Sequence, residues 1–280
     1  MGRSIIHQKA PREELAPGVW LDRLQPGGRT GPANEVLLPY EGGRVWTDSF
    51  ILGSAEQPFQ LMVPDIRLPA NQYWPLHWHD CWIAVVVLDG TCMVGDWWME
   101  PGDVLISAAG LEYGPLLIGP DGCQMFEVFA RLHQQQGGYS PEYRDHPTLT
   151  GGDHVFKPRE GVNRRNEGRQ TLPCDGVEGL VKGRLRPGQY WDLGEPDDPE
   201  RGGMAYTALQ PGEPVPAHSY ADWHALFVMK GGLRIESREL GAGDVILTEP
   251  GARMPAVEAG PAGAELFEVA RVADSMERLA

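Results

Sequence analysis

Two histidines separated by one residue, His77 and His79, are the side chains best suited to hold a metal ion. On a β-strand, residues of the same parity point to one face, and this face continues through Cys81 and Ile83. Two imidazoles at i and i+2 on an inward face can reach one ion at about 2.1 Å from a ring nitrogen. The pair therefore predicts a site for a divalent transition metal, with Fe, Mn, Ni and Zn as candidates.

The segment that holds this pair is repeated 141 residues later (216 − 75). PLHWHDCWIAVVVLDG, beginning at Pro75, aligns with PAHSYADWHALFVMKG, beginning at Pro216. The match continues without a gap to the FEV triplets centred on Glu127 and Glu268, and the recurrence of both glutamates indicates a shared structural role. Because turn and core residues repeat together, we predict a duplicated fold.

Each copy has the sequence pattern of an all-β domain. Residues 82–88 are aromatic, aliphatic or β-branched, and the run ends before Gly90. Short apolar runs separated by turn residues are typical of a sandwich or barrel. We expect the opening strands at Val45–Thr47 and Phe50–Leu52, and helical periodicity only at Ala273–Leu279.

The repeat also predicts the domain organisation. Residues 1–135 are expected to form an N-terminal barrel with its opening strands, and residues 176–280 a second barrel. The segment between them, 136–175, is polar and poor in aliphatic residues, which is typical of a connection.

The histidine pair, the glycine at position 90 and the Pro-Gly-Asp turn at 101–103 resemble the cupin superfamily. Its first motif is G-x5-H-x-H-x3,4-E-x6-G, and its second is G-x5-P-x-G-x2-H-x3-N. The resemblance covers most of both halves and implies two tandem cupin barrels of the double-stranded β-helix, or jelly-roll, type. It does not specify a function, since cupins include dioxygenases, isomerases, decarboxylases, lyases, cyclases, sugar binders and storage proteins.

The first copy matches the cupin motifs only in part. His77 and His79 occupy the two histidine positions, and Ile83 stands where the family has its Glu ligand. Tyr113 stands where the second motif has its His, with Glu112 beside it. The resemblance implies a metal held by both histidines and by an oxygen of Tyr113 or Glu112, either of which is alternatively an acid–base group.

The second copy departs further from the motifs. His218 keeps the first histidine position, whereas Tyr220 replaces the second, His224 stands in the Glu position and Met254 replaces the last His. By parity His218, Asp222 and His224 share one face, so a rearranged second site is one interpretation. The other is that the histidines are hydrogen-bonded core residues.

Tryptophans cluster around the first motif and suggest a pocket. We expect Trp78 and Trp98 to line it together with Cys81 and Ile83, which suits an apolar substrate. Core packing is the alternative for the tryptophans. Cys81 is a soft ligand in one interpretation and a small buried hydrophobe in the other.

Charge and composition exclude several partners. The 24 Lys and Arg residues against 39 Asp and Glu residues leave a net charge of −15, which disfavours nucleic acid and anionic membrane surfaces. Neither a signal peptide nor an apolar stretch long enough to span a bilayer is recognised, and the four cysteines lack zinc-like spacing. We therefore expect a cytoplasmic protein with reduced thiols.

Two functions remain open. The first is a metal-dependent enzyme working in the N-terminal barrel, with dioxygenation of a small apolar or carbonyl-containing substrate as the leading reaction, followed by isomerase, lyase or cyclase chemistry. The second is a metal-free bicupin that binds a small ligand or regulates without catalysis. Sheet edges and Pro-rich loops are compatible with a homodimer.

Overall fold

The computed structural model describes most of both repeated halves. These described residues are 13–23, 35–36, 45–54, 56–57, 59–70, 73–74, 76–131, 137–139 and 174–276, with the backbone alone at 35–36, 45–49, 73–74 and 137–139. Nearly every regular element in this part of the chain is a β-strand, so the all-β prediction is confirmed. Most of the expected connection at 136–175 lies outside the described residues.

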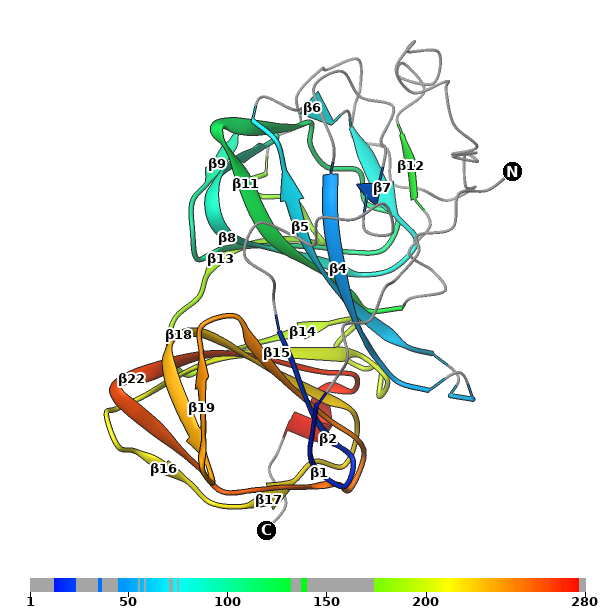
Figure 1. Cartoon of the computed structure of the whole chain (residues 1–280). Helices are drawn as coiled ribbons and strands as arrows, with labels where there is room; N and C mark the ends of the chain where they lie inside the picture. The colour runs from blue at the N-terminus through cyan, green and yellow to red at the C-terminus, as the bar shows by residue number, and fades with distance from the viewer. Residues whose placement is uncertain are drawn as a thin grey trace. The chain divides into compact units, whose positions relative to one another are not determined.

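The first large sheet belongs to the N-terminal half. Its strands are β3 (Glu35–Val36), β4 (Val45–Leu52), β5 (Leu61–Leu68), β6 (Tyr73–Trp74), β8 (Ile83–Val94), β9 (Trp97–Met99), β10 (Asp103–Ser107), β11 (Leu116–Phe129) and β13 (Leu180–Arg184). They follow the order β13-β10-β8-β11-β5-β4-β3, with β6 on β11 and β9 on β8 (Figure 1). A separate pair joins β7 (His77–His79) to β12 (Gly137–Tyr139). β4 contains both predicted opening strands.

The second large sheet repeats this plan. Its strands are β1 (Glu13–Ala16), β2 (Val19–Arg23), β14 (Gln189–Leu193), β15 (Gly202–Leu209), β16 (Pro214–Val215), β18 (His224–Ile235), β19 (Arg238–Gly241), β20 (Asp244–Thr248) and β22 (Val257–Ala270). The order is β1-β2-β20-β18-β22-β15-β14, with β16 on β22 and β19 on β18. β17 (His218–Ser219) pairs with β21 (Arg253–Met254).

The sequence repeat is reproduced by the strands and their turns. β8 and β18 begin 141 residues apart (224 − 83), and so do β5 and β15, β10 and β20, and β11 and β22. Gly90 and Gly231 have φ angles of 69° and 68°. A Cβ atom at either would lie 2.1 Å from the carbonyl oxygen of Gly122 or 2.0 Å from that of Gly263. The repeated glycines are therefore required by a close backbone approach.

The two sheets exchange strands across the domain boundaries expected from the sequence. β1 and β2 precede the first barrel in the chain, but β2 pairs with β20 of the second sheet. β13, which lies beyond residue 176, pairs with β10 of the first sheet. The expected segments 1–135 and 176–280 thus do not coincide with the sheets. Each sheet takes an edge strand from a part of the chain that the sequence repeat assigns to the other barrel.

A buried cluster identifies the inner face of the second barrel. It contains alternate residues of three adjacent strands, including Leu226, Val228, Ile246 and Leu266. The residues 141 positions earlier are also buried, at Val85, Val87, Leu105 and Met125. Their cross-strand register is the same, with Val85 opposite Leu105 and Val87 opposite Met125. These residues define the inner face of the first barrel.

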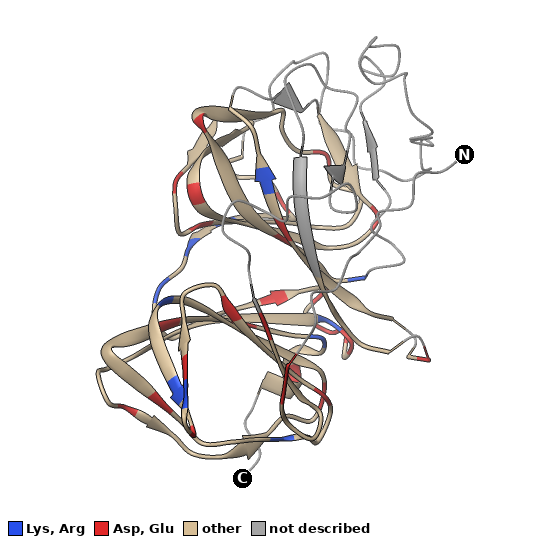
Figure 2. Ribbon diagram, in the orientation of Figure 1, with Lys and Arg blue, Asp and Glu red and all other residues tan. Residues whose placement is uncertain are grey.

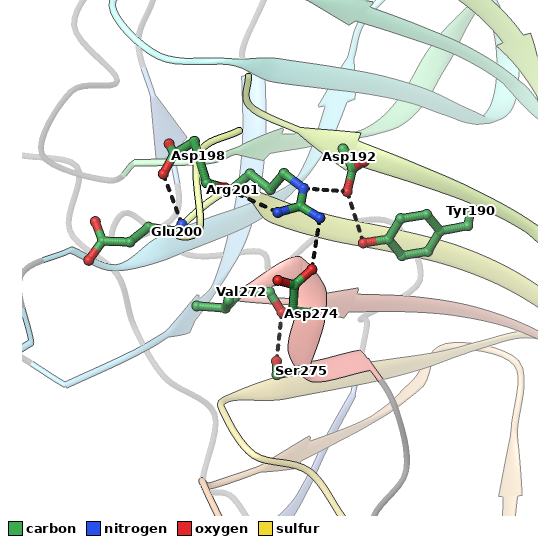
Figure 3. A network of polar contacts seen from close by, with 8 residues as sticks. All are labelled: Tyr190, Asp192, Asp198, Glu200, Arg201, Val272, Asp274 and Ser275. Carbon is green, nitrogen blue, oxygen red and sulfur yellow. Dashed lines mark hydrogen bonds and ion pairs between the residues drawn. The ribbon is translucent and has the colours of Figure 1, made fainter. Parts of the chain in front are cut away.

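The chain's last described element is the 3-10 helix η3 (Ala273–Met276), in the segment where helical periodicity was expected. Arg201 holds it in place (Figure 3). Its guanidinium donates to Asp274 at 2.7 Å and to Asp192 at 3.0 Å, and its carbonyl accepts from the Ala273 amide at 2.7 Å. Three contacts with one arginine thus fasten the end of the second barrel.

The charged side chains form no basic stripe on the described ribbon. Figure 2 shows Lys and Arg scattered singly, with Asp and Glu between them. Within the described ranges, no helix has the length and apolar character needed to cross a membrane.

Candidate functional site

The histidine pair lies on β7 with both rings on one face. The ring centroids of His77 and His79 are 5.4 Å apart, and the ring planes are nearly perpendicular, at 89°. His77 is buried, with 5% of its surface exposed, whereas His79 is partly exposed. Solvent therefore reaches the pair at His79.

This spacing fits a shared metal ion. With a metal–nitrogen distance of about 2.1 Å, the centre of an imidazole ring lies about 3.2 Å from the metal. Two ring centres 5.4 Å apart then subtend roughly 115° at the ion, close to a tetrahedral angle. The separation of the two rings therefore allows both to reach one ion.

Tyr113 is the side chain that the fold brings to the pair. Its backbone exchanges hydrogen bonds with His77, at 3.0 and 3.2 Å, so the two residues are direct cross-strand partners. Such partners point to the same face. The Tyr113 ring lies 4.5 Å from the His77 ring and 6.1 Å from the His79 ring, between centroids. The adjacent Glu112 is buried but has the opposite parity.

The donors present at this site are therefore two imidazoles and one phenol oxygen. No group of three or more His, Cys, Asp or Glu side chains suited to a metal is found in the described part of the chain. An ion would be held by His77 and His79, with the oxygen of Tyr113 as the nearest candidate for a third ligand, whereas Glu112 lies on the other face.

Cys81 lies outside the strand that carries the histidines. The chain bends at Asp80 and Cys81, between β7 and β8, so the strict alternation assumed from the sequence is broken. The thiol is buried beside the backbone of Arg131 and Ala130, and burial raises its pKa to about 11. This environment suits a small packed side chain rather than a thiolate ligand.

The walls of the site are not the expected tryptophans. Trp78 alternates with the histidines on β7 and is buried on the opposite face, and Trp98 is 48% exposed. Ile83 is buried on the inner face opposite Phe129, as expected for a lining residue. The Phe129 ring centroid lies 5.2 Å from that of His79.

Sequence reasoning gave Glu127 only a structural role, but its position brings it to the same interior. It lies opposite Val85 on the inner face and two residues before Phe129. Its side chain is partly exposed, yet burial raises its pKa to about 7. Both observations fit a carboxyl group that is surrounded by protein and still touches solvent. The FEV repeat was the signal that could have marked it.

In the second barrel the corresponding glutamate is the centre of a buried polar cluster. Glu268 accepts a hydrogen bond from Thr207 at 2.9 Å and one from Tyr220 at 3.5 Å. Its carboxylate lies 3.3 Å from the His224 ring nitrogen Nε2. Tyr220 stacks on His224 with centroids 3.7 Å apart and planes at 12°.

The expected grouping of His218, Asp222 and His224 is not formed. Asp222 lies in the bend between β17 and β18, where parity no longer applies, and accepts two hydrogen bonds from Arg271. His218 Nδ1 lies 2.8 Å from the Pro216 carbonyl oxygen, and a carbonyl only accepts, so Nδ1 carries the proton. His218 is therefore a hydrogen-bonded core histidine, whereas His224 is a buried histidine that stacks on Tyr220 and lies beside Glu268.

The two interiors differ in their access to solvent. In the second barrel Tyr220 and His224 are 0% exposed and Glu268 is 3% exposed. Their counterparts in the first barrel are His79, Ile83 and Glu127, of which His79 and Glu127 are partly exposed. Solvent therefore reaches these polar groups in the first interior but not their counterparts in the second.

No protein-family model matches the chain, and no curated protein sequence matches it either. Several solved structures, however, match the chain. A candidate dioxygenase from Nostoc punctiforme superposes with a TM-score of 0.60 at 12% identity, over 98% of this chain and 89% of that one. Oxalate decarboxylase from Bacillus subtilis, a protein with Mn(II) centres, gives 0.56 at 15% identity, over 88% and 76%.

A third structure is the bacterial pirin YhhW from Escherichia coli, in complex with nickel(II). It gives a TM-score of 0.51 at 13% identity, over 91% of this chain and 99% of that one. At such identities the likeness concerns the fold, and here it agrees with the duplicated strands and their register. The chain has the cupin fold, in the form of two tandem jelly-roll barrels.

Proposed function

We propose that the chain is a metal-dependent cupin enzyme whose reaction takes place in the first barrel. The observation that carries this proposal is the geometry of His77 and His79, two rings spaced for one ion in an interior that solvent can enter. The second barrel, in which Tyr220, His224 and Glu268 are buried against one another, supports the fold.

Both the similar solved structures and the side chains of this protein support a divalent metal. Among proteins of this fold, the Bacillus subtilis decarboxylase has Mn(II) centres and the Escherichia coli pirin is a nickel(II) complex. In this chain two imidazoles are complemented by a phenol oxygen, a set suited to Fe, Mn, Ni or Zn. A bound ion would supply a Lewis acid with coordination positions left over for substrate or O2.

The reaction that we propose is dioxygenation of a small apolar or carbonyl-containing substrate. The Nostoc punctiforme structure, described as a candidate dioxygenase, supports it through the fold alone. From this chain, Ile83 and Phe129 supply an apolar wall beside His79, and Tyr113 presents a phenol at the same place. These side chains would orient an apolar substrate and exclude water from its far side.

A metal-free binding protein is the second candidate. It is favoured by Ile83 and Tyr113, since each stands where the cupin motif has a ligand. In that case Tyr113 and the two histidines would hydrogen-bond a small ligand directly.

Metal analysis separates the two. Protein purified without chelator, and again after reconstitution, is analysed for Fe, Mn, Ni and Zn. We expect close to one ion per chain in the wild type, its loss from the double variant His77→Ala/His79→Ala, and its retention in His218→Ala, the matched variant of the second barrel. Circular dichroism reports whether each variant is folded. Negligible metal in reconstituted wild type, or metal retained by the folded double variant, contradicts the proposal.

A further inference from the structure

Glu127 and Glu268 occupy the same position on the last strand of their barrels, 141 residues apart (268 − 127). Both face inward, because each lies opposite an inner-face residue of the neighbouring strand, Val85 or Leu226. Each barrel therefore has one carboxyl group at the same position of its strand. The effect of the different neighbours on the two carboxyl groups can then be compared directly.

The neighbours of the two glutamates differ in their ability to form hydrogen bonds. Glu268 interacts with Thr207, His224 and Tyr220. The first barrel has Ile66 and Ile83 in place of Thr207 and His224, and neither isoleucine side chain has hydrogen-bonding atoms, whereas His79 stands in place of Tyr220. No hydrogen bond to the Glu127 carboxyl group is seen among the described residues. Glu127 keeps its place on the strand without counterparts for two of the three partners of Glu268.

Access also distinguishes the two carboxyl groups. Glu268 is 3% exposed and sealed in its cluster, whereas Glu127 is partly exposed. Phe129, two residues beyond Glu127 on the same face, contacts the His79 ring. A molecule that enters the first barrel beside His79 thus meets Glu127 on the same wall.

The environment of Glu127 raises its pKa toward neutral pH. Burial, the one cause of the shift, raises the pKa of Glu127 to about 7. The thiol of Cys92, inside the barrel, has its pKa raised by burial first and then by the negative charges of Cys123 and Glu127. The charge on Glu127 is thus felt within the barrel. An acid–base group works best with a pKa near the working pH.

We infer that Glu127 hydrogen-bonds an oxygen atom of the substrate of the first barrel and exchanges a proton with it. The inference rests on the proposed function in that barrel. The neutral carboxyl O–H bond breaks as the proton forms an O–H bond on a substrate oxyanion, which leaves Glu127 as a carboxylate. The reverse transfer removes a proton from the substrate. The substrate class is accordingly a compound with an ionisable oxygen, such as an enol, a hydroxyl group or a carboxylic acid.

The test is labelling with a water-soluble carbodiimide and glycine methyl ester, mapped by peptide mass spectrometry. The carbodiimide reacts with protonated, reachable carboxyl groups, which then form an amide with the amine. We expect Glu127 to be labelled at pH 7 at least tenfold faster than Glu268, with a rate that halves near pH 7. Glu258, a half-exposed carboxylate of β22 that pairs with Arg234, serves as a control for a carboxyl group at the surface.

Formate, oxalate and pyruvate are then added singly, as small acids whose oxygens accept a hydrogen bond. At least one is expected to slow the labelling of Glu127 severalfold without changing that of Glu258. An unlabelled Glu127, a rate that follows pH as that of Glu258 does, or labelling that none of the three acids slows overturns the inference. The labelling is measured with and without chelator. The reactivity of Glu127 is thus tested separately from the binding of a metal.

Discussion

Replacing Glu127 with Gln should change how the stability of the protein depends on pH. Gln has nearly the shape of the neutral carboxyl group but does not ionise. The pKa of Glu127 is raised by burial from 4.5 to about 7. The folded protein therefore holds this proton more tightly than the unfolded chain does, and ionisation opposes folding.

The size of the effect follows from the shift. A difference of about 2.5 units (7 − 4.5) at about 1.36 kcal/mol per unit corresponds to about 3 kcal/mol. Because the carboxyl group is partly exposed and meets water, this is an upper limit. The stabilising contribution is complete below pH 4.5 and is lost as the pH rises through about 7.

Urea unfolding, followed by tryptophan fluorescence at pH 4.5, 6 and 8.5, measures the free energy of unfolding of both proteins. We expect Glu127→Gln to match the wild type at pH 4.5 and to exceed it by up to about 3 kcal/mol at pH 8.5. Glu258→Gln, which removes a half-exposed carboxylate of β22 paired with Arg234, should show no gain in stability between pH 6 and 8.5. A difference between Glu127→Gln and wild type that is constant with pH, or that favours the wild type at pH 8.5, refutes the assignment of a raised pKa.

Three further outcomes are expected. In denaturant unfolding, Gly90→Ala should cost roughly 3 kcal/mol or more, because the new Cβ would lie 2.1 Å from a carbonyl oxygen. Gly110→Ala should cost only about 1 kcal/mol, because Gly110 has a similar φ of 75° but open space around it. Thr207→Val should cost about 1–2 kcal/mol, since it leaves one oxygen of buried Glu268 without its donor. Cys81 should react with iodoacetamide at pH 8 only after unfolding, as mass mapping would show, because it is buried and its pKa is raised to about 11.

The duplicated fold was predictable because it depends on features that are local in the sequence. Turn glycines such as Gly90 and Gly231 mark places where only a residue without Cβ fits, and they recur at the spacing of the strands. Strand alternation then identifies the inner face. The same reasoning correctly placed Ile83 inside and the rings of His77 and His79 on one face.

Parity failed where the chain bends. Cys81 and Asp222 occupy matching positions between two strands, in bends where strand alternation no longer applies. Asp222 pairs with Arg271, a long-range ion pair that no local pattern predicts. The pairing of β2 with β20 and of β13 with β10 could not be predicted either, because the sequence of an edge strand indicates a strand but not which strand it pairs with.

Glu127 shows why recurrence alone was a poor guide to role. Identical residues at identical positions were interpreted as one structural function, yet the role of a carboxyl group depends on what faces it. Glu268 lies beside Thr207 and His224 and is an acceptor within a buried cluster. With isoleucines in their place, the same group retains a proton near neutrality and contacts solvent. The partners of Glu268 are replaced in the first barrel by Ile66, His79 and Ile83. The double variant Ile66→Thr/Ile83→His restores two of them and should lower the pKa of Glu127, which carbodiimide labelling as a function of pH would measure.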